Sequence, residues 1–242
     1  MKTFKITKKT IICVVVCVSI LLTGVFSILL VENNCRQKDS DVFVQYYNNK
    51  CQSYSEENKT LEKGQIVFLG DSLTEGCTLG DYYSDLPLKS YNRGIGGDTT
   101  NGLLNRLKVS AYEVLPSKIV ILIGGNDILR GFSNARIARN YKKILNEIKD
   151  NLPNARVYCV SILPISDSVQ SNVNVDKFIS KAKVVNDKIE TLANERGYGF
   201  IDIHSDFAND KGYLSNVYTT DGVHLTQDGY LLLSSKVKNF IK

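Results

Sequence analysis

Short apolar runs alternate with helical patterns of apolar residues from residue 65 to the end of the chain. The most apolar run, Lys118–Ile123, reads I-V-I-L-I after its lysine, which is typical of a strand buried on both faces of a sheet. Four further runs predict strands, at Ile66–Leu69, Ser90–Asn92, Arg156–Ile162 and Gly199–Ile203. Strands that alternate with helices favour a parallel sheet covered on both sides. The chain is therefore expected to be an α/β protein with about five strands.

Amphipathic helices are predicted between and after these strands. Apolar side chains recur at steps of three and four residues from Ile137 to Leu152 and again from Phe178 to Leu192. Gly197 follows the second pattern and is typical of a helix end. A last helix is predicted from Thr226 to Phe240. Because each helix has one apolar face, each is expected to pack on the sheet.

Polar and glycine-rich segments follow the first three predicted strands. Ser72 comes after the first strand, Gly94–Thr100 after the second and Gly124–Asp127 after the third. In open parallel sheets, ligands bind beyond the carboxyl ends of the strands. We therefore expect these three segments to meet at one functional site.

Ser72 and His224 have the chemistry of a nucleophile and its base. A serine hydroxyl needs a base within hydrogen-bond reach and a third group to orient that base. Asp221 precedes His224 by three residues, and Gly222 between them gives the turn freedom to bend. A carboxylate at this spacing is expected to reach the imidazole Nδ1–H, which leaves Nε2 facing the serine. The alternatives are a helix N-cap for Ser72 and an ordinary turn at Asp221-Gly222.

An oxyanion hole is the second requirement of acyl transfer. Ser72 offers its backbone N–H, and the glycines of Gly94–Asp98 let backbone N–H groups approach a ligand closely. Asn126 offers a side-chain N–H. Asp71 is expected to brace its loop as a hydrogen-bond acceptor, and Asp127 is expected to be structural. His204 is expected to be a solvated loop residue.

The N-terminal region predicts a membrane anchor. Residues 11–31 contain no charged side chain, and a helix of that length spans roughly 30 Å, the thickness of a bilayer core. Four lysines lie in residues 1–10, so the positive-inside rule predicts a cytoplasmic tail and an extracytoplasmic remainder. A cleaved signal peptide is the alternative, but the run is long for one and lacks a small-residue cleavage site.

Residues 32–64 form a polar lead-in between the anchor and the domain at 65–242. Phe43, Tyr47, Cys51 and Tyr54 recur at helical spacing, which predicts a helix from about Asp41 to Lys59 as a stalk or an outer-layer helix, followed by Gly64. Cys35 and Cys51 are candidates for a disulfide outside the cell. Elsewhere, Tyr82, Tyr83 and Leu79 are candidates either for lining an acyl pocket or for packing.

Charge and cysteine usage narrow the function classes. The net charge is +5, and the four lysines before the apolar run account for four of these charges. A nearly neutral domain gives no support for a nucleic-acid partner. No C-x-x-C pattern occurs, so no zinc site is predicted. Cys159 lies in a predicted buried strand and is expected to act as a small apolar residue.

Four motif blocks in order resemble the SGNH hydrolases, also called GDSL esterases. The blocks are Gly70-Asp71-Ser72-Leu73, Gly94-Ile95-Gly96-Gly97-Asp98-Thr99-Thr100, Gly124-Gly125-Asn126-Asp127 and Asp221-Gly222-Val223-His224-Leu225. The resemblance covers roughly residues 65–242 and is strongest to the branch with platelet-activating-factor acetylhydrolase catalytic subunits and bacterial acylhydrolases. It implies a flavodoxin-like three-layer α/β/α sandwich.

The resemblance also implies roles at matching positions. Ser72 matches the family nucleophile, Asp221 and His224 match the acid and base, and Gly97 and Asn126 match the oxyanion-hole donors beside the Ser72 N–H. It implies a short acyl group on a small-molecule, glycan or lipid ester, and no metal or organic cofactor. An acyltransferase or acetylesterase acting on envelope polysaccharide, and a non-catalytic binding module on the same fold, are the alternatives. The sequence does not determine the alcohol part of the substrate or the oligomeric state.

Overall fold

The structure is a computed structural model that describes residues 41–169 and 173–242. The chain divides into two compact units, residues 1–49 and residues 50–242. The predicted anchor at residues 11–31 lies outside the described residues. Among the helices that are described, none has the length and apolar character needed to cross a bilayer.

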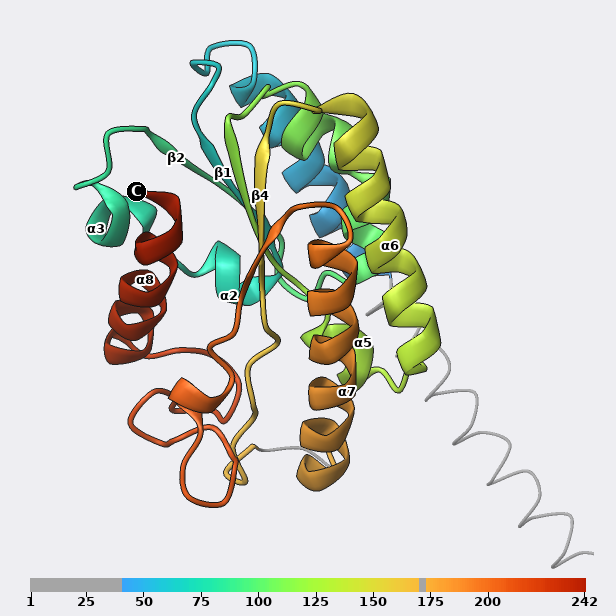
Figure 1. Ribbon diagram of the computed structural model, residues 1–242, viewed down its shortest axis with the longest axis vertical. Helices are drawn as coiled ribbons and strands as arrows, with labels where there is room; N and C mark the ends of the chain where they lie inside the picture. The colour runs from blue at the N-terminus through green and yellow to red at the C-terminus, as the bar shows by residue number, and fades with distance from the viewer. Residues whose placement is uncertain (1–40, 170–172) are drawn as a thin grey trace, which may run out of the picture. The chain divides into compact units, whose positions relative to one another are not determined.

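Five parallel strands form one sheet in unit 50–242, in the order β2-β1-β3-β4-β5 (Figure 1). The strands are β1 (Ile66–Gly70), β2 (Ser90–Gly94), β3 (Lys118–Leu122), β4 (Arg156–Val160) and β5 (Gly199–Ile201). The family resemblance implied a flavodoxin-like sandwich without specifying the order of its strands, and the predicted number of parallel strands is confirmed. β4 and β5 end earlier than predicted, because the chain leaves the sheet after the pair Val160 and Ile201.

Helical elements follow β1 throughout the described part of this unit. They are α2 (Ser72–Glu75), α3 (Leu79–Tyr83), α4 (Thr100–Asn105), the π-helical turn η1 (Lys108–Tyr112), α5 (Gly125–Leu129), α6 (Asn134–Asn151), α7 (Val175–Asn194) and α8 (Gln227–Ile241). A short 3-10 turn, η2 (Ser205–Phe207), lies between β5 and α8. Side-chain oxygens of Ser133, Asn174 and Thr226 cap the N-termini of α6, α7 and α8.

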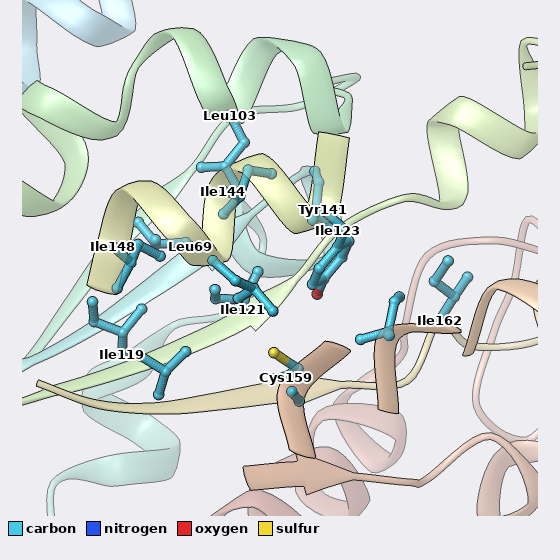
Figure 2. Close-up of a cluster of buried hydrophobic side chains, with 14 of the residues drawn as sticks. Leu69, Leu103, Ile119, Ile121, Ile123, Tyr141, Ile144, Ile148, Cys159 and Ile162 are labelled. Carbon is cyan, nitrogen blue, oxygen red and sulfur yellow. The ribbon is translucent and has the colours of Figure 1, made fainter. Parts of the chain in front are cut away.

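The helices cover the two faces of the sheet and make two cores. α6 and α7 pack on one face, and α3 and α8 lie on the other (Figure 1). Figure 2 shows Ile144 and Ile148 of α6 against Ile119 and Ile121 of β3. All four side chains are fully buried, and burying one such side chain contributes about 1.5–3 kcal/mol. This arrangement confirms the predicted apolar faces of both long helices.

The predicted buried role of Cys159 is also confirmed. Its side chain is fully buried in the core that Figure 2 shows, near Tyr141. Cys35 lies outside the described residues, so its pairing with Cys51 stays a prediction.

The lead-in helix spans residues 41–57 and is followed by turns up to Thr60. It is two residues shorter at its C-terminal end than the predicted 41–59. Gly64 has a φ of +77° and lies in the turn before β1 instead of at the helix end. The second compact unit begins at Lys50, upstream of the predicted domain start at residue 65. The last turns of this helix therefore belong to the unit that contains the sheet.

Candidate active site

Strand register brings the three polar segments to one edge of the sheet. Gly70 at the end of β1 pairs with Gly94 of β2 and with Leu122 of β3. The segments that begin at Asp71, Ile95 and Ile123 therefore leave the sheet side by side. This is the arrangement that the carboxyl ends of parallel strands predict.

Ser72 is the first residue of α2, and its neighbour Asp71 is the N-cap. The Asp71 carboxylate accepts a hydrogen bond of 3.1 Å from the Leu73 N–H. This is the bracing role predicted for Asp71. Because Asp71 fills the capping position, the Ser72 hydroxyl is not used as a cap and points elsewhere.

The Ser72 hydroxyl meets the imidazole of His224. Oγ of Ser72 lies 2.9 Å from Nε2 of His224, and Nδ1 of His224 lies 2.6 Å from Oδ2 of Asp221. The sequence separates the serine and the histidine by 152 positions. A carboxylate only accepts, so Nδ1 carries the proton and Nε2 is left as the acceptor for the serine hydroxyl.

The Asp221 turn is held by its own backbone. Oδ1 of Asp221 accepts hydrogen bonds from the N–H groups of Val223, at 2.8 Å, and His224, at 2.7 Å. Gly222 has a φ of +89°, a conformation that a residue with a Cβ rarely adopts. Partial burial opposes ionisation of Asp221, but the hydrogen bonds from the His224 ring and from these two N–H groups outweigh it and lower the pKa of Asp221 to about 2. The carboxylate is therefore ionised at neutral pH.

At this edge, the backbone N–H groups of Ser72 and Gly97 have no hydrogen-bond partner among the described residues. The N–H groups on either side of Gly97 are both engaged. Gly96 donates to Oε2 of Glu75 at 2.7 Å, and Asp98 donates to the carbonyl of Ile95 at 3.1 Å. The φ of Gly97 is +72°, which explains the glycine at this turn.

Asn126 in α5 lies beside the same loop. Its Nδ2 donates to the carbonyl of Asp98 at 3.0 Å, which uses one of its two amide hydrogens. The carbonyl of Gly97 accepts from Nη2 of Arg130 at 2.6 Å. The loop that carries Gly97 is thus attached to α5 at two points.

Three carboxyl groups near this edge of the sheet are buried and interact electrostatically, those of Asp71, Asp98 and Asp127. Burial, with repulsion from Asp98 and Asp127, outweighs the Leu73 N–H and raises the pKa of Asp71 to about 7. Arg106 is fully buried and pairs with Asp98 at 2.7 Å. Asp127 accepts from the backbone and hydroxyl of Thr100, at 2.9 and 2.6 Å, which is the structural role predicted for it.

A small apolar cavity of about 40 Å³ lies against Ser72. Its lining includes Leu122 from β3, Leu129 from α5 and Phe178 from α7, together with residues 162–165 after β4. Asn126 and Asp71 also line it. Space for an apolar group therefore lies directly beside the hydroxyl.

The model of the GDSL-like lipase/acylhydrolase family matches residues 68–232, which contain all of these residues. The chain belongs to this family. It is a hydrolase that acts on ester bonds.

Relatives of this GDSL hydrolase include platelet-activating factor acetylhydrolase IB subunits. The alpha1 subunit of Homo sapiens is 29% identical over 170 residues, which cover 69% of this chain and 70% of the relative. The alpha2 subunit of Mus musculus is 27% identical over 183 residues, which cover 73% and 75%.

A solved structure from Streptococcus pneumoniae, provisionally described as a platelet activating factor, matches this hydrolase with a TM-score of 0.79. It is 27% identical, and the match covers 85% of this chain and 97% of that one. The family match and these relatives confirm the predicted resemblance.

The structure also gives the positions of His204 and of the residues considered as lining for an acyl pocket. His204 lies in a loop as expected, but it is half-buried instead of solvated, because its Nδ1 donates to the carbonyl of Ile162 at 2.7 Å. Leu79 and Tyr83 are buried in the core under α8, so they pack instead of lining the cavity beside Ser72. The ring of Tyr82 contacts that of Tyr230 in a tilted arrangement, with the ring centroids 5.8 Å apart. Within the described residues, no cluster of His, Cys, Asp and Glu has the arrangement of a metal site.

Sequence reasoning missed Arg106 and Glu75. Arg106 donates to Asp98, to Ser110 and to the carbonyls of Gly70 and Arg93. It follows a helix as an ordinary basic residue, and nothing local in the sequence indicates its burial. Glu75 follows Ser72 by three residues, two positions after the end of the first block, and that proximity was the available signal.

Proposed function

We propose that this hydrolase cleaves its ester through a covalent acyl-serine intermediate, with Ser72 as nucleophile, His224 as base and Asp221 as the group that orients the imidazole. The observation that carries the proposal is the continuous chain of contacts of 2.9 and 2.6 Å from the serine through the imidazole to the carboxylate. The hydrogen-bond donors to the ester carbonyl oxygen of the substrate would be the N–H groups of Ser72 and Gly97 and the side-chain amide of Asn126.

The reaction proceeds in two halves. Nε2 of His224 takes the proton from the Ser72 hydroxyl as Oγ bonds to the ester carbonyl carbon, and the three donors stabilise the oxyanion. His224 then gives its proton to the leaving alcohol as the C–O bond breaks. Water attacks the acyl-serine in the same way, with the proton passing through His224, and releases the carboxylic acid.

A short acyl group, of the size of acetyl, fits the cavity beside Ser72. The cavity of about 40 Å³ is far smaller than the engineered apolar cavity of about 150 Å³ that accepts benzene. Relatives named as platelet-activating factor acetylhydrolase subunits support the same size of acyl group. The alcohol part of the ester would lie on the open side of the serine.

The mechanism is tested by turnover of p-nitrophenyl acetate by the full chain. We expect Ser72→Ala to lose essentially all of the wild-type rate, because the Ser72 hydroxyl is the group that hydrogen-bonds Nε2 of His224. Equal rates for wild type and Ser72→Ala would refute the mechanism. Ser168→Ala is the control, since this serine hydrogen-bonds Ser166 and has no place in the proposed reaction.

Residues 11–31 would anchor the enzyme in a membrane with residues 1–10 in the cytoplasm and the hydrolase outside. The uncharged run and the four preceding lysines support this topology. After expression in a bacterial host, an alkaline carbonate wash should leave the full-length chain in the membrane pellet. Release of a chain that lacks its first 30 or so residues would indicate a cleaved signal peptide instead.

A further inference from the structure

The helix that precedes β1 contacts the loop that carries Gly97 through Lys50 and Glu75. Nζ of Lys50 lies 2.8 Å from Oε1 of Glu75, and the other oxygen of Glu75 accepts the Gly96 N–H at 2.7 Å. Lys50 and Glu75 are both about 70% buried, with side-chain exposures of 31% and 27%. An ion pair in this setting is screened less than one on the open surface. Lys50 thus fixes the Glu75 carboxylate, which in turn binds the Gly94–Gly97 loop at the Gly96 N–H.

Tyr54, one helical turn after Lys50, makes a second attachment. Its hydroxyl donates to the carbonyl of Gly94 at 2.5 Å, and its side chain is only 4% exposed. Two cations lie close to its ring, Nζ of Lys50 at 5.5 Å and the Arg93 guanidinium at 4.5 Å from the centroid. Lys50 and Tyr54 both lie outside residues 68–232, the region that the family model matches.

These attachments leave one peptide group of the loop unpaired. In the peptide before Gly96, the N–H is bonded to Glu75. In the peptide after Gly97, the carbonyl is bonded to Arg130 and the N–H to Ile95. Between them, the N–H of Gly97 has no partner among the described residues. Fixed neighbours on both sides determine the direction in which this N–H points.

We propose that Lys50, Tyr54 and Glu75 are positioning residues that hold the Gly94–Gly97 loop so that the Gly97 N–H points at the oxyanion. The inference rests on the proposed function, because it requires Gly97 to be an oxyanion donor. It assigns the helix that precedes β1 to the catalytic apparatus. Removal of an oxyanion donor itself costs about 10²–10³-fold in kcat, and loosening its support is expected to cost less, about 10-fold.

The experiment compares variants of the full chain on p-nitrophenyl acetate. Tyr54→Phe removes only the hydroxyl, and Glu75→Ala removes the acceptor for Gly96. Each should lower kcat about 10-fold with KM unchanged within twofold, because the oxyanion exists only in the transition state. Glu75→Gln keeps an acceptor oxygen and should recover most of the loss. Tyr112→Phe is the matched control, since its hydroxyl bonds Glu147 near the opposite end of the sheet.

A second measurement does not depend on turnover. Amide hydrogen exchange of a peptide covering residues 92–99 should be about 10-fold faster in Tyr54→Phe and Glu75→Ala than in wild type or Tyr112→Phe. Unchanged exchange together with wild-type kcat in both variants would overturn the inference. Equal loss in Glu75→Gln and Glu75→Ala would also overturn it. Failure of the proposed function has a different signature, which is wild-type turnover that Ser72→Ala does not remove.

Discussion

Asp221 uses its two carboxylate oxygens for two different tasks. Oδ1 accepts the N–H groups of Val223 and His224, and Oδ2 accepts from the imidazole. In Asp221→Asn, one oxygen can still hold the turn, but an amide NH₂ then faces the ring. That amide favours the tautomer with its proton on Nε2, which cannot accept the serine proton.

We expect Asp221→Asn to lower kcat by about 10²–10⁴-fold with a melting temperature close to that of wild type. Steady-state kinetics and thermal unfolding measure the two effects. Asp202→Asn is the control, since Asp202 accepts the His204 N–H in a similar local bond but lies outside the proposed reaction. A kcat within threefold of wild type would contradict the role of Asp221.

Asp71 links stability to pH. Burial raises its pKa to about 7, so the folded protein binds this proton more tightly than the unfolded chain does. The associated stability is present at low pH and is lost as pH rises from about 4 to about 7. Between pH 5 and pH 8, the loss should be about 2–3 kcal/mol in the free energy of unfolding.

The variant Asp71→Asn isolates this effect, because asparagine still caps α2 but does not titrate. Urea unfolding at pH 5 and pH 8 should show wild type losing stability relative to Asp71→Asn as pH rises. A difference between the two proteins that stays constant across this range would contradict the raised pKa.

At the scale of elements, Arg106 joins the ends of three of them. It follows α4 and donates to carbonyls at the end of β1 and within β2, and it also pairs with Asp98 in the loop after β2. Its side chain is 1% exposed, as is that of Asp98. Because both side chains are buried, water cannot replace the hydrogen bonds that the Arg106 guanidinium or the Asp98 carboxylate would lose with its partner.

Breaking this buried pair should destabilise the protein strongly. We expect Asp98→Asn to lower the free energy of unfolding by about 3–5 kcal/mol, because it leaves a buried guanidinium without its counter-charge. Urea unfolding measures the change. The exposed pair of Lys59 and Glu56 is the comparison, and Glu56→Gln should cost under about 1 kcal/mol. Similar small effects at both sites would show that the buried pair is not a structural link.

The acyl cavity is also built by several elements, and α7 closes it with Phe178. Phe178→Leu replaces the aromatic ring with a smaller apolar side chain, which enlarges the cavity and keeps an apolar side chain at this position. We expect the ratio of butyrate to acetate turnover to rise about 10-fold, because the longer chain then fits. Leu192→Ala, on the same helix but outside the cavity lining, should leave the ratio unchanged. An unchanged ratio in Phe178→Leu would place the acyl group elsewhere.

On the scale of the whole molecule, the fold and the serine, histidine and aspartate contacts were predictable. A run such as Lys118–Leu122 has few alternatives to a buried strand, and the apolar stripe of α6 requires a surface to cover. Because the strands are parallel, the segments that follow them leave the same edge of the sheet, which brings Ser72 and Asn126 close together. The strand order was not predicted, since local patterns do not specify which strands are neighbours.

Long-range effects were not predictable from local patterns. The burial of Arg106, the raised pKa of Asp71 and the contact of Lys50 with Glu75 each depend on segments distant in the sequence. A lysine on an amphipathic helix looks the same whether it faces water or a carboxylate. The contact of Lys50 with Glu75 lies within the compact unit of residues 50–242.

The most direct test of the central claim is to locate the reactive residue chemically. The full chain is treated with a fluorophosphonate, digested and analysed by mass spectrometry. We expect one adduct, on the peptide that contains Ser72, and little or none in His224→Ala. An adduct on another residue, or undiminished labelling of Ser72 in His224→Ala, would contradict the claim that His224 activates Ser72.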